Sequence, residues 1–251
     1  MVPLVGFSSH RHYQLTSLAS RALARKEKLV SHAARIGRIF MSKRFTLHGF
    51  WLSGPTYKVA LMLSLCGEPF AFRQINLRAG EHKTPDFLAK NRFGQVPALD
   101  DAKLGVSLCQ SAAILEHLAL ELGRFKGDEP GDLIRAREWM FWDFDKLAPP
   151  IYRSRACRAG LRSFNQPIME MYAAEANLAL KTLNDHLAGR DWLVGKSPTI
   201  ADIDIYGVAC MAGQAGFDIT AHANVAAWAK RFEGLPGFGN AQAVVPQEHR
   251  A

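Results

Sequence analysis

The hydrophobic and polar positions of residues 45–124 change period several times, which predicts strands and helices in alternation. Residues 45–49 alternate as in a short strand, whereas Val59, Ala60, Leu63 and Cys66 recur at helical spacing before Gly67. The same reasoning predicts strands at 70–75, 96–99 and 104–106, a short helix starting at Thr84 and Pro85, and an amphipathic helix at 111–122. This order predicts a small α/β sheet domain over residues 45–124.

The pattern changes at residues 125–130, where glycine, proline and charged residues predict a linker. Beyond it, apolar residues recur at helical spacing over about 131–153, 166–188, 199–214 and 222–233, and no strand pattern follows. Thr199 and Asp202 have the spacing of an N-cap and its reciprocal carboxylate. Residues 131–251 are therefore expected to form an all-helical domain.

Residues 1–44 form a basic N-terminal extension with a different character. This segment is rich in serine and arginine, poor in acidic residues, and carries an apolar stripe at helical spacing. Such composition is typical of an organelle targeting segment, and it also suits a helix on an anionic membrane surface. A third interpretation is a mis-assigned start, with Met41 as the true first residue. Under each interpretation the extension is not part of the predicted fold.

The distribution of charge along the chain limits the classes of partner that we expect it to bind. The formal net charge is +8, and the extension, with nine basic residues and one acidic residue, accounts for all of it. The remaining residues are electrically neutral, so composition reveals no basic face for nucleic acid, and we expect none as a partner. Hydrophobic residues make up 48% and charged residues 22%, which is ordinary for a globular protein.

The cysteines and the apolar runs exclude several classes of protein. The four cysteines lie far apart with no Cys-x-x-Cys pair, which argues against a disulfide scaffold and a cysteine zinc site and favours a reducing compartment. Apart from His10 and His12, the histidines show no metal-ligand spacing, so we predict no metal. The apolar runs are too short to span a bilayer. We expect a cytoplasmic protein without integral membrane association.

Four short motifs occur in a characteristic order. They are Phe93–Leu99 (FGQVPAL), Cys109–Glu116 (CQSAAILE), Ser197–Asp202 (SPTIAD) and the segment Ala227–Phe238. With this order of elements, the chain resembles the cytosolic glutathione S-transferase family over about residues 45–243, specifically its serine-type, bacterial-like members. The resemblance implies a thioredoxin-like N-terminal domain, an all-α C-terminal domain and a homodimer.

The resemblance implies a glutathione site around two of these motifs. In the family the proline matching Pro97 is cis, and the main chain of the preceding residue, here Val96, pairs with the cysteinyl part of glutathione. Gln95 precedes this pair. Gln110 and Ser111 lie where a strand gives way to a helix, whose free N–H groups favour the γ-glutamyl carboxylate. The simpler interpretation of Ser111 is a helix N-cap, and both roles use the same geometry.

Ser53 is the candidate for activating the thiol. Thioredoxin-like relatives carry Cys-x-x-Cys in this loop, whereas this sequence has Ser53 and Thr56 at the two places. In serine-type members the matching hydroxyl donates a hydrogen bond to the glutathione sulfur. Lowering a thiol pKa of about 8.5 by about two units requires roughly 2.7 kcal/mol. One hydrogen bond to a charged group contributes about 1.5–3 kcal/mol. Thr56 and Tyr57 are the alternative hydroxyls, and a plain loop serine is the simpler interpretation.

The remaining candidate residues follow from the resemblance alone. Lys83 or His82 would hold the glycyl carboxylate of glutathione, unless each is only a solvated charge at a helix start. The first helix of the helical domain carries a stripe of aromatic residues and would line the pocket for the electrophile. Such a stripe more often belongs to the hydrophobic core. The candidates for this pocket are Trp51, Trp139, Trp142 and Tyr152.

The resulting hypothesis is a glutathione transferase that directs the glutathione thiolate at a hydrophobic electrophile in detoxification, moving alkyl or aryl groups. One alternative is a glutathione-dependent disulfide or peroxide reductase on the same fold. Another is a binding module without catalytic activity.

Overall fold

The computed structural model describes residues 43–245. Residues 1–42 of the basic extension, with its apolar stripe, His10, His12 and Met41, lie outside the described residues. None of the helices within 43–245 is both long and apolar enough to cross a bilayer.

A four-stranded sheet organises the first half of the described chain. Its strands are β1 (Phe45–Gly49), β2 (Phe70–Gln74), β3 (Ala98–Asp101) and β4 (Val106–Cys109), in the order β2-β1-β3-β4. The β1 strand runs parallel to β2 and antiparallel to β3, and Leu47 of β1 lies between Phe72 and Leu99. Phe45 and Leu47 are fully buried, as the alternation of the sequence predicts.

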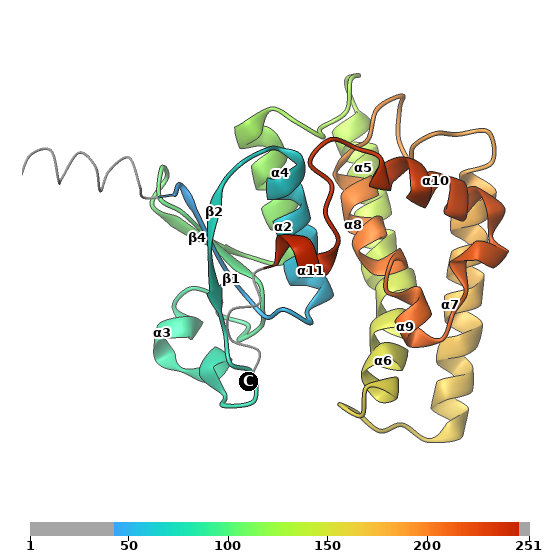
Figure 1. The fold of residues 1–251 in the computed structure, drawn as a ribbon, viewed down its shortest axis with the longest axis horizontal. Coiled ribbons are helices and arrows are strands. Elements are labelled where there is room, and N and C mark those ends of the chain that lie inside the picture. The colour runs from blue at the N-terminus through green and yellow to red at the C-terminus, as the bar shows by residue number, and fades with distance from the viewer. Residues whose placement is uncertain (1–42, 246–251) are drawn as a thin grey trace, which may run out of the picture. The chain divides into compact units, whose positions relative to one another are not determined.

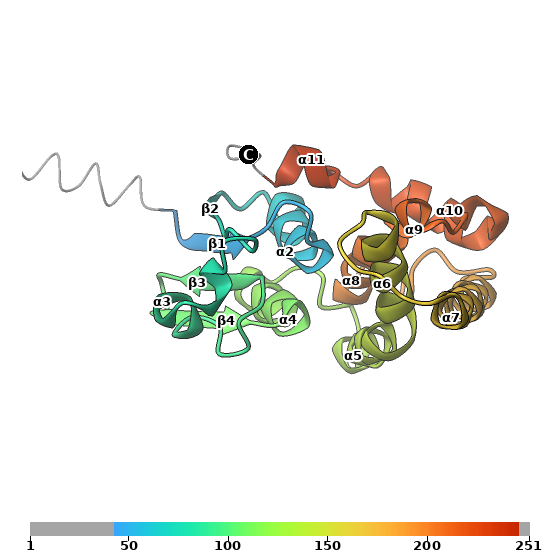
Figure 2. The same cartoon turned by 90° about the horizontal axis from the view of Figure 1, so that it is seen from below.

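Helices cover both faces of this sheet (Figures 1 and 2). On one face lie α2 (Gly54–Leu65) and α4 (Ser111–Leu122), and on the other lies the short α3 (Pro85–Leu88), preceded by η1 (Glu81–Lys83). Ser53 caps the N-terminus of α2, and Pro55 lies in its first turn. Nearly every side chain of α2 is buried, because this helix packs against the sheet and also against α8 of the helical part.

The second half of the chain is helical within the described residues. Its elements are α5 (Asp132–Trp142), the π-helical η2 (Asp143–Leu147), α6 (Ala148–Arg158), α7 (Gln166–His186), α8 (Ile200–Ala209), α9 (Ala212–Ala215), η3 (Ile219–Ala221), α10 (Ala223–Glu233) and α11 (Ala241–Val244). After α10 the chain returns to α2, where Tyr57 donates a hydrogen bond to the carbonyl of Gly239 and Ser64 to that of Gly237. The last segment therefore ties the helical part to the sheet part.

The capping box at the start of α8 is confirmed. The Thr199 hydroxyl accepts a hydrogen bond from the Ala201 N–H, and the Asp202 carboxylate accepts one from the Thr199 N–H at 2.8 Å. The same carboxylate also accepts hydrogen bonds from the Leu193 N–H and the Trp228 indole. Asp202 thus fixes the start of α8 and joins it to two other segments.

The boundaries of several predicted elements differ from those observed. The predicted strand at 96–99 begins two residues later, and Asp101, expected in a turn, belongs to β3. The strand predicted at 104–106 is observed at Val106–Cys109. A buried aspartate fits this strand because Arg44 and His117 pair with its carboxylate. The predicted helix at 131–153 extends to Arg158 and is interrupted by η2. The predicted helix at 199–214 is divided into α8 and α9.

Candidate functional site

A cleft of about 390 Å³ separates the sheet part from the helical part. One wall comes from the sheet part and the other from η2 and α6. The residues that line this cleft are Pro55, Asn91, Gln95, Val96, Pro97, Gln110 and Ser111 on the first wall, and Phe144, Ala148, Pro149, Tyr152 and Arg153 on the second. The structure therefore brings together Gln95, Val96, Pro97, Gln110, Ser111 and Tyr152 of the predicted site.

The Val96–Pro97 peptide bond is cis, as the family resemblance implies. No residue that the structure describes forms a hydrogen bond with the main chain of Val96. Its N–H and C=O groups are thus free to pair with an extended ligand, as the edge of a sheet pairs with an added strand.

Asn91 holds this turn in place, and the sequence reasoning missed it. Its buried amide nitrogen donates to the carbonyls of Gln95 and Pro97, and its oxygen accepts from the Phe93 N–H at 3.0 Å. Asn91 thus fixes the main chain on both sides of Val96. A polar side chain with both donors and an acceptor, placed shortly before a glycine turn, is the signal that would have indicated it.

The second feature of the cleft is the N-terminus of α4. Gln110 occupies the N-cap position with a φ of 69°, and no side chain of the described residues forms a cap hydrogen bond with the first turn. Ser111 is the first residue of the helix and is buried, so the interpretation of Ser111 as the N-cap is wrong. The first N–H groups of α4 therefore remain available for an anion, which the helix dipole favours.

Ser53 keeps a hydroxyl proton to donate. Its Oγ accepts a hydrogen bond from the Thr56 N–H at 3.2 Å as the cap of α2, and the side chain is half-buried. Pro55 of the same loop lines the cleft, whereas Ser53 and Trp51 are not among the lining residues. Trp51 packs instead against the hydrophobic core.

The two alternative hydroxyls are excluded by their surroundings. Thr56 is fully buried, and its Oγ1 accepts a hydrogen bond from the Phe50 N–H at 3.3 Å. Tyr57 is buried as well and donates to the carbonyl of Gly239 at 3.0 Å. Burial raises the pKa of Tyr57 far above its usual range, so its phenol stays protonated. Both hydroxyls lie on the core side of α2, which argues against a contact between either of them and a ligand in the cleft.

Arg155 supports the Ser53 loop from the opposite wall, and the sequence reasoning missed this residue too. Its Nη1 donates to the carbonyl of Leu52 at 2.8 Å, and its Nε donates to Gln214 at 2.6 Å. Burial lowers the pKa of Arg155, although a guanidinium remains charged at every physiological pH. A positive charge thus lies one residue from Ser53.

Lys83 and His82 lie beside the cleft rather than in it. The Nζ atom of Lys83 donates to the carbonyl of Gly94 at 3.1 Å, at the start of the turn that contains Val96. Neither residue is among those that line the cleft. The geometry therefore places a positive charge near the turn without assigning the glycyl carboxylate to either side chain.

Trp139 and Trp142, which were predicted to line the substrate pocket, are not among the residues that line the cleft. Trp139 packs edge-on against Trp142, with ring centroids 5.2 Å apart, and against His186 of α7 at 4.4 Å. Helical spacing turns both tryptophans toward α7. Phe144 and Tyr152 occupy the cleft instead, and Tyr152 lies so close to Gly54 that a Cβ there would meet its hydroxyl at 2.4 Å.

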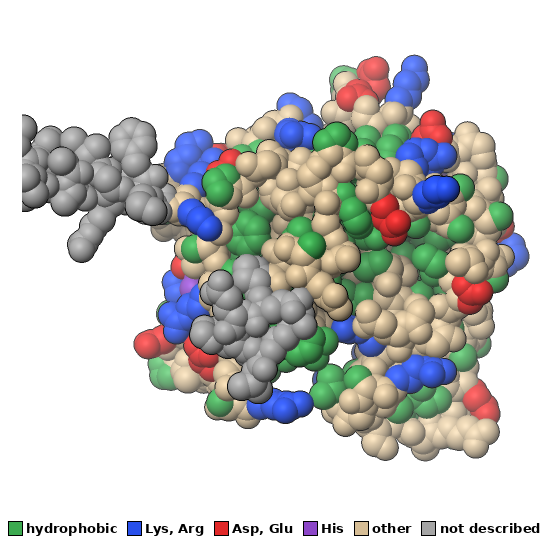
Figure 3. Space-filling model, in the orientation of Figure 1, with side chains coloured by type: hydrophobic (Ala, Val, Ile, Leu, Met, Phe, Trp, Pro, Cys, Tyr) green, Lys and Arg blue, Asp and Glu red, His purple; other side chains and the backbone are tan. Residues whose placement is uncertain are grey.

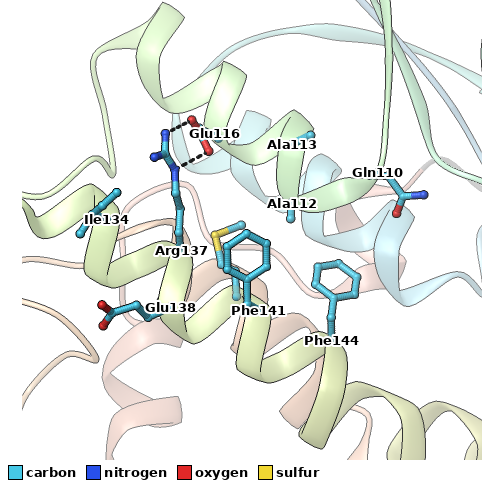
Figure 4. A pocket seen from close by; sticks show the side chains of 10 residues that line it. Gln110, Ala112, Ala113, Glu116, Ile134, Arg137, Glu138, Phe141 and Phe144 are labelled. Atoms are coloured by element: carbon cyan, nitrogen blue, oxygen red, sulfur yellow. Dashed lines mark hydrogen bonds and ion pairs between the residues drawn. The ribbon is translucent and has the colours of Figure 1, made fainter.

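A larger apolar groove of about 790 Å³ lies between α4 and α5 (Figure 4). Ile134, Phe141 and Phe144 lie on one side of this α4–α5 groove, and Ala112 and Ala113 lie on the other. The Phe141 side chain is 71% exposed. Across the groove, Nε of Arg137 donates to Glu116 at 2.8 Å. Such an apolar surface is unusual on a protein that has no partner.

Possible metal ligands and basic side chains were located on the described part of the chain. Within 43–245, no group of three or more His, Cys, Asp or Glu side chains could hold a metal ion. On the face drawn in Figure 3, the Lys and Arg side chains are distributed over several separate parts of the surface.

Comparisons with known proteins agree with this arrangement. Residues 43–120 match the glutathione S-transferase N-terminal domain, and residues 158–236 match the C-terminal domain of the same family. The chain is 29% identical to a maleylacetoacetate isomerase of Rhizobium meliloti, over 80% of this chain and 97% of the relative. It is 25% identical to the disulfide-bond oxidoreductase YfcG of Escherichia coli, over 74% of this chain and 88% of the relative.

Two solved structures extend the comparison. A glutathione S-transferase from Pseudomonas fluorescens superposes with a TM-score of 0.74 at 29% identity, covering 79% of this chain and 99% of that one. Ure2p in complex with glutathione superposes with a TM-score of 0.72 at 25% identity, covering 81% of this chain and 96% of the Ure2p chain. Both family domains and the sheet-plus-helices architecture are thus present in one chain, and this chain belongs to the glutathione S-transferase family.

Proposed function

We propose that this protein binds glutathione in the cleft, activates its thiol and transfers the thiolate to a hydrophobic electrophile. The observation that carries the proposal is the pairing of two unsatisfied features in one cleft: the free main chain of Val96 and the uncapped N-terminus of α4. The main chain of Val96 suits the peptide-like cysteinyl part of glutathione, and the N-terminus of α4 suits the γ-glutamyl carboxylate. Lys83 or His82 would serve the glycyl carboxylate.

Ser53 would act on the sulfur as a serine-type hydroxyl. Its proton is free to point at a thiolate, and the N-terminus of α2 adds a favourable dipole. The Arg155 guanidinium, held on the Leu52 carbonyl, contributes positive charge to the same loop. Stabilising the thiolate and positioning it against a second substrate supply the rate gain, and no covalent intermediate forms on the protein.

Such a reaction suits the detoxification of electrophiles in the cytoplasm. The thioredoxin-like part, about 45–124, would supply the glutathione site, and the helical part after the linker would supply the second wall. The electrophile would lie against Phe144 and Tyr152, which form the apolar part of that wall. Neither a metal nor nucleic acid takes part.

The decisive experiment is a titration of the bound glutathione thiolate by its ultraviolet absorbance as the pH is raised. A thiol pKa clearly below that of free glutathione supports the proposal. Binding with an unshifted thiol pKa identifies a carrier instead, and absence of binding contradicts the glutathione assignment altogether. The full chain is used, together with a second sample that starts at Met41, to exclude an effect of the basic extension.

We propose that a second copy of the chain covers the α4–α5 groove. The face carries both a protruding Phe141 and an apolar recess, which is what a two-fold symmetric contact needs from one surface. Gln110 and Phe144 line both the groove and the cleft, so the partner would also border the site. Sedimentation velocity should give a dimer that dissociates in Phe141→Glu. The control is Leu178→Glu, which places the same charge on the exposed face of α7.

One observation favours a second reaction on the same site. A relative of similar length is named a disulfide-bond oxidoreductase, and this chain has no cysteine at positions 53 or 56. Reduction would therefore use the sulfur of glutathione itself rather than a protein thiol. Measurable disulfide reduction together with negligible conjugation of aromatic halides would favour the reductase.

A further inference from the structure

Arg153 is the only charged side chain among the residues that line the cleft. It lies on α6, next to Tyr152 and close to Phe144, on the wall opposite Val96 and the N-terminus of α4. The other lining residues are apolar or neutral polar, so no acidic side chain within that lining offsets the guanidinium.

Tyr172 holds Arg153 in place. Nη1 of Arg153 donates to the Tyr172 hydroxyl at 3.2 Å, and its guanidinium carbon lies 5.5 Å from the centre of the Tyr172 ring. Tyr172 is itself buried in α7. The arginine is therefore partly ordered before any ligand binds, which reduces the entropy lost when it forms further hydrogen bonds.

The charge of Arg153 is uncompensated. No carboxylate within residues 43–245 lies at ion-pair distance from it, whereas Arg44 and Arg137 each pair with an acidic side chain. A guanidinium has five N–H donors, and the bond to Tyr172 uses one. The remaining donors suit the two oxygens of a carboxylate.

We propose that Arg153 selects second substrates that carry a carboxylate beside an apolar portion. The inference deepens the proposed function and rests on it, because it assigns the second wall of the cleft to the electrophile. The apolar portion would lie against Phe144 and Tyr152, and the carboxylate would accept two hydrogen bonds from Arg153. Glutathione would leave this arginine free, since its γ-glutamyl carboxylate has the N-terminus of α4 and its cysteinyl part has Val96.

The test compares two glutathione conjugates of nearly equal shape, S-(para-carboxybenzyl)glutathione and S-(para-carbamoylbenzyl)glutathione. Their affinities for the full chain are measured by calorimetry, with glutathione alone as the reference. The same comparison is made for turnover of para-chloro-meta-nitrobenzoate and the corresponding benzamide, each divided by its uncatalysed rate with glutathione. The readout in both cases is the ratio of anionic to neutral ligand.

The wild-type protein should favour the carboxylate by about 10- to 100-fold, as for a hydrogen-bonded ion pair. Arg153→Gln should bring the ratio close to one, and Arg153→Lys should restore part of it. The matched control is Arg162→Gln, which removes the same charge from an exposed position outside the cleft lining and should leave the ratio unchanged.

Equal binding of the two conjugates to the wild type overturns the inference, as does a ratio that survives Arg153→Gln. If Arg153→Gln weakens glutathione and both conjugates to the same extent, Arg153 holds glutathione itself and the inference is wrong. If the thiol pKa is lowered but the protein does not distinguish the anionic from the neutral conjugate, the proposed function is supported and the inference about Arg153 is contradicted. If the protein prefers the anionic conjugate but leaves the thiol pKa unshifted, the anion site is supported and the proposed transferase activity is contradicted. If neither conjugate binds, both the inference and the proposed function are contradicted.

Discussion

The Nζ atom of Lys58 lies 2.8 Å from Oδ2 of Asp143, and both side chains are buried away from solvent. Oδ1 of Asp204 lies at the same distance from the ammonium group. Lys58 belongs to α2, which starts at the Ser53 loop, whereas Asp143 begins η2 and Asp204 lies on α8. This triad therefore joins the two walls of the cleft through charges rather than through apolar contacts alone.

Replacing Lys58 by methionine should destabilise the protein strongly. Methionine has a similar length, but it leaves two buried carboxyl groups without their cation, which typically costs about 3–5 kcal/mol. Urea unfolding monitored by tryptophan fluorescence measures the loss. Lys181→Met serves as the control, because that lysine forms an exposed pair on α7 and its loss should cost about 0.5 kcal/mol or less. Equal losses in the two variants would contradict a buried charge triad.

The contribution of Asp143 to the free energy of unfolding should fall as the pH rises from the acidic range through neutrality. Burial raises the pKa of Asp143 above the ordinary value of about 3.9, and Lys58 only partly opposes this effect. A carboxyl group with a raised folded pKa binds its proton more tightly when folded. Its contribution to stability is therefore complete below the ordinary pKa and is lost as the pH rises through the folded one.

Asp143→Asn should remove this dependence on pH, since an amide does not titrate. The comparison is the free energy of unfolding of both proteins in urea at several pH values between acidic and neutral. Parallel pH profiles for the wild type and the variant would show that Asp143 titrates normally.

Ser53→Ala should raise the pKa of the bound glutathione thiol while changing glutathione affinity little. The variant loses the hydroxyl that would donate to the sulfur, and one such hydrogen bond is worth about one to two pKa units. The ultraviolet titration of the bound thiolate gives the shift directly. Ser111→Ala should do the opposite, weakening binding by about tenfold and leaving the thiol pKa unchanged. An unshifted thiol pKa in Ser53→Ala would remove the catalytic role from this residue.

Asn91→Ala should weaken glutathione binding by roughly 10-fold or more, because the carbonyls of Gln95 and Pro97 lose their shared donor. Val96 would then no longer be held in one orientation, although Asn91 itself need not touch the ligand. The expected pattern is a higher dissociation constant with an unaltered thiol pKa. Asn91→Asp is a second, more severe variant, since it keeps the acceptor for Phe93 but replaces the donors by a carboxylate oxygen that faces the two carbonyls. Unchanged affinity in both variants would rule out this positioning role.

Arg155→Met should reduce turnover without abolishing binding of glutathione. The variant keeps the length of the side chain but loses the hydrogen bond to Leu52 and the charge beside the Ser53 loop. We expect a thiol pKa raised by several tenths of a unit to about one unit. Arg158→Met provides a control on the same helix, where the guanidinium packs over Gly216 instead. A larger effect at position 158 would show that the charge of α6 as a whole, not the contact with Leu52, matters.

Local patterns were sufficient where an element is governed by its own residues. The bounds of β1 and α4 were predicted to the residue, and the caps at Thr84 and Thr199 were predicted from their hydroxyls and the residues that follow. The π-helical segment that begins at Asp143 was not predicted, and the Asp143 carboxylate pairs there with Lys58 of another helix. Spacing alone also did not show that Trp139 of the aromatic stripe packs against His186 of α7.

Sequence patterns were enough to predict the family, the order of the elements and the two motifs, around Val96 and Ser111, that border the cleft. Each of these depends on residues close together in the chain. The side chains that support or complete the site became evident from the folded structure alone. Asn91 acts through a turn, Arg155 reaches a carbonyl 103 residues away, and Arg153 has no acidic side chain beside it among the residues that line the cleft. Such relationships depend on where distant segments come to lie, which no periodicity records.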